Sequence, residues 1–223
     1  MASRTRVLNS SIGSKLLIGA TGLGLFVYLV IHVSANLMVF LGADTFNGTA
    51  DKLERLPLLP VIEIGLLLVF LLHIVGTIQM YVDNRKARPV PYVQKKMAGP
   101  PSRKTYASST MILSGLWLLA FLIIHVKAFK FSQTYEWGEG AKDFYRLEMD
   151  NFRNPLMVGF YVLSMIVVGS HLSHGIASAF QSLGLSGRRF TPRVLVAGRL
   201  LSALIAVAFI AIALWAYFIA GRS

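Results

Sequence analysis

Five stretches of this chain are apolar over a length that can cross a membrane, and polar segments separate them. A transmembrane helix needs about 20 mostly apolar residues, because each residue advances the helix by about 1.5 Å. The five stretches cover residues 15–41, 60–83, 105–131, 154–183 and 193–220. The pattern predicts an all-α, polytopic membrane protein that forms a single domain of five transmembrane helices.

The connecting segments predict shorter elements. Four prolines fall within residues 84–104, which favours an extended connector. Residues 51–56 predict a short helix that Pro57 stops, and the Asn47-Gly48-Thr49 run before it predicts a turn. Residues 136–154 mix aromatic with charged side chains, a composition typical of a helix on a membrane surface. We expect no internal repeat along the chain.

Composition agrees with a membrane protein, since 55% of the residues are hydrophobic and only 14% are charged. The net charge of +12 could suggest nucleic acid, but its distribution argues for a membrane. Fourteen Lys and Arg residues fall at the N-terminus, in residues 84–104 and in residues 188–199, against eight on the other side of the membrane. Positive loops stay in the cytoplasm. We therefore expect the N-terminus inside and the C-terminus outside, with the basic loops binding anionic lipid or a cytoplasmic partner.

The chain contains no cysteine. Covalent haem attachment, iron–sulfur ligation and disulfides are therefore excluded on this chain.

All five histidines fall within the apolar stretches: His32, His73, His125, His171 and His174. An ionisable side chain at membrane depth is costly and usually marks a functional site. At 1.5 Å per residue, His32 lies about 24 Å and His125 about 28 Å from the inner face. His73 lies only about 12 Å and His171 about 15 Å from that face. Depth thus pairs His32 with His125 and His73 with His171.

Each pair joins two different helices, as required for a haem held in a four-helix bundle by one axial imidazole on each side. Such a bundle would comprise the first four segments, with the fifth segment packed beside it. Two axial histidines leave no open iron position, which suits electron transfer. Depth does not decide between His171 and His174 as the ligand. A packing role, a proton relay or metal transport remain alternatives, although the last two usually need carboxylates near the midplane.

Several short motifs occur in order along the five segments. They are Ile31-His32 with Asn36, Leu72-His73 with Gly76, Ile124-His125-Val126, the PLMVGFY run at residues 155–161, His171-Leu172-Ser173-His174-Gly175 and Thr191-Pro192-Arg193. In these motifs the chain resembles the single-polypeptide, di-haem cytochrome b subunit of succinate:quinone oxidoreductases and fumarate reductases, the b558-type membrane anchor. The resemblance covers nearly the whole chain.

The resemblance implies two non-covalent haem b groups, an inner one on His73 and His171 and an outer one on His32 and His125. It favours His171 as the ligand and leaves His174 a supporting hydrogen bond to a propionate or quinone. It also implies the bacterial cytoplasmic membrane, with a flavoprotein subunit that carries FAD and an iron–sulfur subunit docking on its cytoplasmic face. The dicarboxylate chemistry would reside on those partners.

The resemblance further implies a quinone, usually menaquinone, that reacts near the outer haem. A quinone that changes redox state exchanges protons, and Glu63 is the best-placed carboxyl, with Asp51 and Glu54 behind it. Glu63 can equally be a helix N-terminal acid that the helix dipole favours. Asn36 is expected to bind near the outer haem or quinone. Partners for haem propionates at the inner end are Ser14, Lys15 and Ser182.

Two other functions stay open. One is a cytochrome b subunit of a different oxidoreductase, such as a hydrogenase or a formate dehydrogenase. The other is a transporter without haem.

Overall fold

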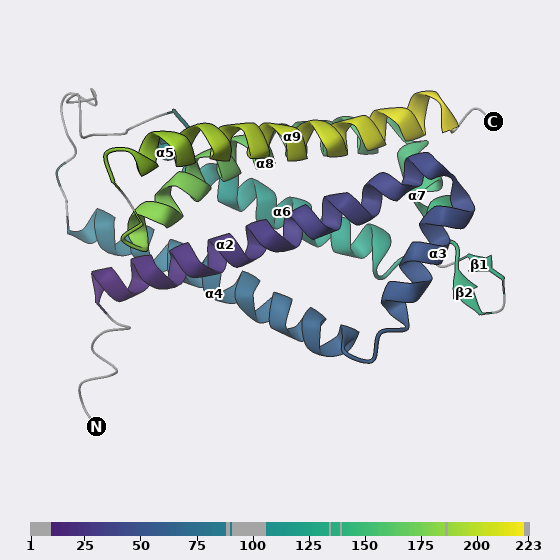
Figure 1. Cartoon of the computed structure of the whole chain (residues 1–223), viewed down its shortest axis with the longest axis horizontal. Helices are drawn as coiled ribbons and strands as arrows, with labels where there is room; N and C mark the ends of the chain where they lie inside the picture. Colours follow the sequence, from purple (N-terminus) through teal and green to yellow (C-terminus); the bar gives the residue numbers. More distant parts are fainter. Residues whose placement is uncertain are drawn as a thin grey trace.

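The structure is a computed structural model that describes residues 10–87, 90, 106–133, 135–138, 140–185 and 187–220. Within these residues, five helices are long and apolar enough to cross a membrane (Figure 1). They are α2 (Ser11–Asn36, continued by the 3-10 helix η1, Leu37–Leu41), α4 (Leu59–Lys86), α6 (Met111–Phe129), α8 (Pro155–Ser182) and α9 (Phe190–Phe218). The predicted all-α membrane fold is confirmed, and each helix overlaps the segment predicted for it.

Local chemistry explains where the long helices begin and end. Ser10 caps α2, and its hydroxyl oxygen accepts a hydrogen bond from the Gly13 amide at 3.0 Å. Asn154 caps α8 before Pro155, which occupies the first helical position, where no amide hydrogen is needed. Gly184 follows the end of α8 with a φ of +75°, the left-handed conformation that terminates helices.

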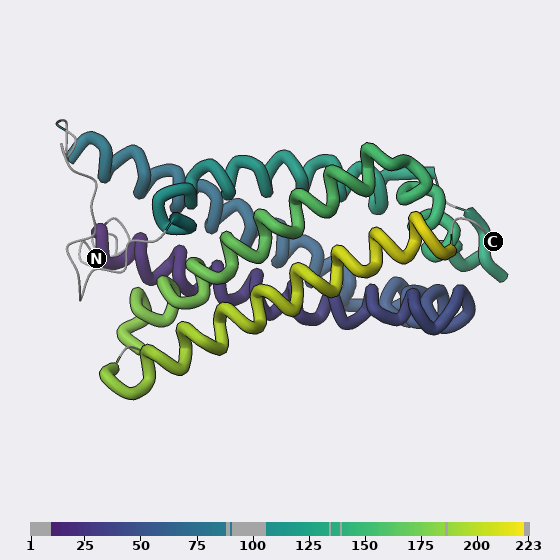
Figure 2. The backbone as a smooth tube through the Cα atoms, turned by 90° about the horizontal axis from the view of Figure 1, so that it is seen from above, coloured from purple at the N-terminus to yellow at the C-terminus, as the bar shows by residue number. Residues whose placement is uncertain are grey.

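The α8–α9 hairpin is the most closely packed part of the bundle, and its helices join at the end that also holds the N-terminus (Figure 2). Small residues allow the two backbones to approach each other. A Cβ on Gly169 would lie 3.1 Å from the Cβ of Ala206, and one on Gly198 would lie 3.2 Å from Ile176 Cγ2. On its other side α8 packs against α2 and α6, and α2 also packs along α4.

A layer of short elements covers one end of the bundle, which we call the capped end; the opposite end is the N-terminal end (Figure 1). The layer comprises α3 (Ala43–Glu54), α7 (Phe144–Phe152) and the hairpin of β1 (Glu136–Trp137) with β2 (Ala141–Lys142). Asn47 is fully buried within it. The Asn47 amide donates to Asp143 Oδ1 at 2.8 Å and accepts from the Tyr145 backbone amide at 2.9 Å. These bonds join two loops that are far apart in the sequence.

Three predictions about the connecting segments need correction. Asn47 lies within α3 rather than in a turn, because that helix begins at Ala43 and ends at Glu54, short of the predicted residue 56. The helix expected within residues 136–154 spans only Phe144–Phe152, where Leu147 and Phe152 are buried in the protein, and its place on a membrane surface stays a prediction. The third segment breaks at Thr110, between α5 (Tyr106–Ser109) and α6. The prolines of residues 84–104 lie outside the described residues.

Candidate functional site

His32 on α2 and His125 on α6 form a pair toward the capped end. Their ring centroids are 5.9 Å apart, and the ring planes are nearly perpendicular, at 85°. Two imidazoles on opposite sides of one metal ion have ring centres about 6 Å apart, since each metal–nitrogen bond is about 2.0 Å and each ring adds about 1 Å. The spacing of this pair therefore fits two axial ligands of one iron.

His73 on α4 and His171 on α8 form the second pair, toward the N-terminal end. The two rings are close enough to interact electrostatically, and His174 also interacts with His171. Thr21 contacts His73 and stands eleven residues before His32 on α2, which corresponds to about 16 Å along the helix. The two pairs therefore lie at different depths, in the arrangement that depth along the sequence predicts.

Each of the four paired imidazoles has a polar side chain next to its Nδ1 atom. The contacts are Thr21 Oγ1 to His73 at 3.2 Å, Ser114 Oγ to His171 at 2.9 Å, the Tyr161 hydroxyl to His125 at 3.0 Å and Asn36 Nδ2 to His32 at 3.4 Å. Metal-binding histidines commonly use one ring nitrogen for such a partner and the other for the metal. Where Nδ1 donates to its partner, Nε2 keeps the lone pair and is the ligating atom. The Asn36 amide nitrogen can only donate, so its contact does not hold His32 in that form.

For the pair toward the N-terminal end, the hydrogen bonds of the partner hydroxyls favour one tautomer. The Thr21 hydroxyl donates to a carbonyl of its own helix at 2.7 Å, and the Ser114 hydroxyl does the same at 3.0 Å. A hydroxyl carries only one hydrogen. With each hydroxyl donating to its helix carbonyl, the ring supplies the hydrogen of the contact from Nδ1, and Nε2 carries the lone pair. This is the neutral form that binds iron.

Glycines give these two imidazoles room beside the neighbouring helix. A Cβ on Gly22 of α2 would lie 3.1 Å from Cε1 of His73, and a Cβ on Gly115 of α6 would lie 3.7 Å from Cε1 of His171. The rings therefore lie over glycine backbone, the close approach that a planar group inserted between helices needs. Gly22 is the tighter of the two positions.

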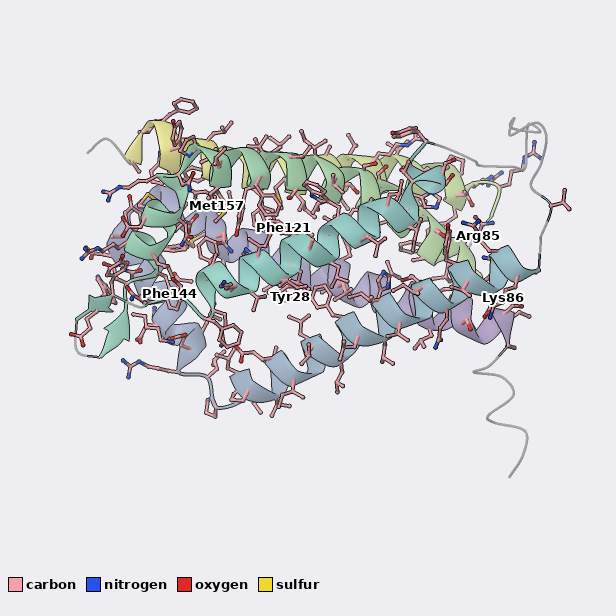
Figure 3. The ribbon with its side chains drawn as sticks, turned by 180° about the vertical axis from the view of Figure 1, so that it is seen from behind. Tyr28, Arg85, Lys86, Phe121, Phe144 and Met157 are labelled. Carbon is pink, nitrogen blue, oxygen red and sulfur yellow. The ribbon has the colours of Figure 1, made fainter. Side chains whose placement is uncertain are left out.

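The α2 and α6 contacts come from an internal repeat, contrary to the expectation that the chain has none. Residues 21–33 (TGLGLFVYLVIHV) and residues 114–126 (SGLWLLAFLIIHV) are identical at seven of thirteen positions. Each copy supplies a hydroxyl and a glycine to the histidine of the next long helix. Each then places an aromatic ring on its own histidine: Tyr28 on His32 and Phe121 on His125, both at 5.5 Å between centroids (Figure 3, where both aromatic residues are labelled).

On α4 and α8, the positions ten residues before the paired histidine carry different side chains. Ten residues before His171 stands Tyr161, and ten residues before His73 stands Glu63. Glu63 forms an ion pair with Lys130 at 2.5 Å between Oε1 and Nζ, and it interacts electrostatically with Tyr28. Both charged side chains of the pair are close to half exposed. Glu63 thus lies toward the capped end, within electrostatic range of Tyr28, the residue that stacks on His32.

The remaining predicted residues lie around these pairs. The Asn36 amide also donates to the His32 carbonyl at 2.8 Å, so it adjoins the capped-end pair. Ser182 faces Gly19 of α2 and stands eleven residues, about 16 Å, beyond His171. Asp51 pairs with Arg55 and Glu54 with Lys142. Both carboxylates are therefore engaged within the capping layer.

Ser14 is half-buried and Lys15 is exposed, both in the first turn of α2 at the N-terminal end. Their roles as propionate partners stay predictions.

The sequence reasoning missed the partners of the imidazoles: Thr21, Ser114 and, as a contact of His125, Tyr161. A search for short repeats would have found the first two, because each precedes a glycine and stands eleven residues before a histidine. It also missed Glu148, a carboxyl on α7 that is only 4% exposed. Burial raises the pKa of Glu148 to about 8.

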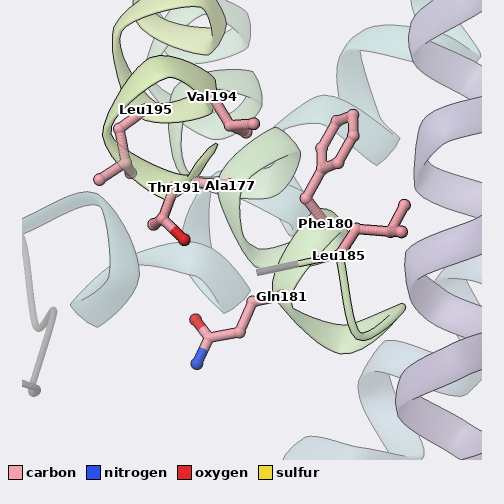
Figure 4. Close-up of a pocket in the computed structure, with 7 residues that line it drawn as sticks. All are labelled: Ala177, Phe180, Gln181, Leu185, Thr191, Val194 and Leu195. Carbon is pink, nitrogen blue, oxygen red and sulfur yellow. The ribbon is translucent and has the colours of Figure 1, made fainter. Parts of the chain in front are cut away.

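A small pocket lies away from both histidine pairs, where the end of α8 meets the start of α9 (Figure 4). Its volume is about 10 Å³, which is room for about one water molecule. The lining residues are Ala177, Phe180, Gln181, Leu185, Thr191, Val194 and Leu195. Its size excludes it as the site of a large cofactor.

Comparison of the chain with protein-family models, with curated proteins and with solved structures finds no match in any of the three.

Proposed function

We propose that this chain is the membrane-anchor cytochrome b subunit of a succinate:quinone oxidoreductase, holding two haem b groups between paired histidines. The observation that supports it most is the arrangement of four imidazoles in two pairs at two depths, each imidazole with a polar partner at Nδ1. The 5.9 Å between the rings of His32 and His125 suits one iron. Resemblance in the short motifs around the histidines adds independent support.

A haem b between two imidazoles takes up and releases one electron without binding oxygen. The protein's part is to hold the ring nitrogens. Thr21 and Ser114 fix the rings of His73 and His171 with Nε2 free, while Tyr28 and Phe121 support the rings of the other pair. With the pairs about 16 Å apart along α2, electrons would cross the membrane in two steps.

Quinone chemistry would take place at the capped end. Glu63 is half exposed there, carries a negative charge balanced by Lys130, and lies near Tyr28. A carboxylate in contact with both water and the site can exchange the protons that a quinone gains or loses. Asn36, beside His32, would provide a hydrogen bond on the same side. Menaquinone is the substrate implied by the resemblance.

The partner subunits would dock at the N-terminal end. The segments that the structure describes at this end carry many basic residues, namely Lys15, Arg85, Lys86, Arg188, Arg189, Arg193 and Arg199. The excess of positive charge supports a cytoplasmic location for this end. A flavoprotein with FAD and an iron–sulfur protein would supply electrons on that side, in the bacterial cytoplasmic membrane.

The test is purification of the complex from its native membrane in mild detergent. We expect a flavoprotein and an iron–sulfur protein to co-purify, and we expect succinate and a menaquinol analogue each to reduce haem b bands. Co-purification of a hydrogenase or formate dehydrogenase subunit would favour a different oxidoreductase. A chain without any haem band would instead favour the haem-free transporter.

A further inference from the structure

The partners of the two histidine pairs differ in whether they can accept a hydrogen bond from the ring. Toward the N-terminal end, the Thr21 and Ser114 hydroxyls donate their hydrogens to carbonyls of their own helices, so each presents only lone pairs to Nδ1. This arrangement favours His73 and His171 with the ring hydrogen on Nδ1 and a lone pair on Nε2. These two rings already have the form that binds iron.

Asn36 favours the opposite form of His32. The Asn36 amide nitrogen donates one hydrogen to the His32 carbonyl at 2.8 Å, which identifies this end of the amide as the nitrogen. The same nitrogen lies 3.4 Å from Nδ1 of His32. An amide nitrogen donates and does not accept, so the ring accepts at Nδ1 and carries its own hydrogen on Nε2. In that tautomer Nε2 has no lone pair for iron.

Tyr161 favours the same form of His125. The Tyr161 side chain is 7% exposed, and the rings of Phe121 and Phe152 pack edge-on against it with centroids 5.0 and 5.1 Å away. Within the described part of the chain, the Tyr161 hydroxyl has Nδ1 of His125 as its hydrogen-bond partner, at 3.0 Å. A buried hydroxyl that donates to no acceptor is costly. Donation to Nδ1 satisfies the hydroxyl and leaves the hydrogen of His125 on Nε2.

To bind iron through Nε2, both capped-end rings must move their hydrogen to Nδ1. The Asn36 amide and the His32 ring then present hydrogens to each other. The Tyr161 hydroxyl becomes an acceptor, and its own hydrogen loses its partner among aromatic rings. Neither change is needed at the other pair. A buried donor that loses its partner weakens binding by about tenfold to a hundredfold.

We propose that Asn36 and Tyr161 make the capped-end site the weaker of the two haem sites, so that a first haem occupies the pair toward the N-terminal end before a second occupies the capped end. This inference rests on the proposed function, because haem b is the ligand of both sites. Each site binds independently, and the difference in affinity alone sets the order. Asn36 and Tyr161 act through the imidazoles and are positioning residues.

The experiment measures haem affinity at each site of the full chain in detergent. His73→Ala leaves only the capped-end site and His125→Ala leaves only the other site. Equilibrium competition with an apo haem-binding protein gives the two dissociation constants, and we expect the constant of the capped-end site to be about tenfold larger or more. In the native chain, added competitor should first remove the haem signal that His125→Ala lacks.

The direction of the change in Tyr161→Phe separates this role from packing alone. In the His73→Ala background, loss of the hydroxyl removes the hydrogen that would be left unpaired, so the capped-end haem should bind about tenfold more tightly. A residue that served only to pack or to accept a hydrogen bond would give weaker binding when changed. Asn36→Leu should also tighten binding, by a smaller factor, because its contact with the ring is longer.

Tyr145→Phe is the matched control, because it removes a tyrosine hydroxyl from the capping layer and should leave the capped-end affinity unchanged. Equal affinities at the two sites, or unchanged or weaker capped-end binding in Tyr161→Phe, would overturn this inference and leave the proposed function standing. If Tyr161→Phe does not fold, the direction of the change in Asn36→Leu decides in the same way.

The reverse outcome is also distinguishable. If the expected difference in affinity is found in a chain that co-purifies with a hydrogenase subunit, the inference is supported and the proposed function is wrong. A native chain that binds no haem overturns both.

Discussion

The two histidine pairs use the same ligand type in different surroundings. Aromatic rings surround the pair toward the capped end, where Tyr28, Phe121 and Phe209 each lie within 5.8 Å of an imidazole centroid. Short elements, α3 and α7, close that end of the bundle. Toward the N-terminal end the imidazoles instead contact a hydroxyl each and lie over glycine.

We infer that the two sites have the same ligands but differ in the charged and polar groups around them. Hydrogen bonds to the ligand, burial and nearby charge set the potential of a haem iron. The capped-end pair has a tyrosine and two carboxyls, Glu63 and Glu148, in its neighbourhood. The other pair has neutral hydroxyls. We therefore expect two haems that titrate at distinct potentials.

Removing one ligand from each pair tests the comparison most strongly. His73→Ala should eliminate the haem toward the N-terminal end and leave the other, halving the haem content, because each iron depends on its own pair. His125→Ala should have the reciprocal effect. Haem content per chain and the reduced-minus-oxidised spectrum provide the measurement. His174→Ala is the control and should keep both haems; equal loss of both signals in His73→Ala, with the chain still folded, would contradict the assignment.

The two repeat glycines offer a matched pair of smaller changes. Gly22→Ala places a methyl group 3.1 Å from the His73 ring, which must shift, whereas Gly115→Ala places one 3.7 Å from His171, an ordinary contact. Gly22→Ala should therefore reduce occupancy of the haem toward the N-terminal end by a large fraction, and Gly115→Ala should change it little. Haem content of the two purified variants measures this. Equal occupancy would show that His73 is not held against Gly22.

Loss of the hydroxyl partners should have a moderate effect. Thr21→Val and Ser114→Ala remove the hydroxyls that contact Nδ1 of His73 and His171. Such partners typically contribute about 10–100-fold in metal affinity, so haem should dissociate more readily from the variants in a competition assay with an apo haem-binding protein. Asn36→Ala, which removes a longer contact of 3.4 Å, should matter less. An identical loss in all three variants would argue against the tautomer assignment.

The smallest effect on haem content is expected for Glu148→Gln, which should instead alter stability. In the unfolded chain this carboxyl ionises above a pKa of 4.5, whereas in the folded chain its pKa is about 8. The free energy of unfolding of the native chain therefore falls as pH rises between these values, by at most about 5 kcal/mol. Glutamine does not titrate. The melting temperature of Glu148→Gln minus that of the native chain should therefore increase as the pH is raised from acidic to mildly basic. A difference that stays constant with pH would contradict this.

Sequence reasoning captured what depends on local pattern. Apolar length alone predicts the five long helices, and a rise of 1.5 Å per residue is enough to pair His32 with His125. It could not place Glu148, because a charged residue in a polar loop gives no sign that α7 will fold onto α8 and α9. The same applies to Asn47, whose burial depends on Asp143, 96 residues away.

The repeat could have been found but was missed, because each copy is only thirteen residues long, with seven identical positions, and the segments around the copies differ. Once found, it predicts that Thr21 and Ser114 have the same role. It does not predict that Glu63 and Tyr161, which stand at equivalent positions, differ in their contacts.

The number of haem b groups bound per chain tests the central claim most directly. A pyridine haemochrome assay on the purified chain, calibrated by quantitative amino-acid analysis, gives this ratio. The account predicts two haems in the native chain and one in each variant that replaces His32, His73, His125 or His171 with alanine. A native chain with no haem, or a single haem that survives all four substitutions, would contradict it.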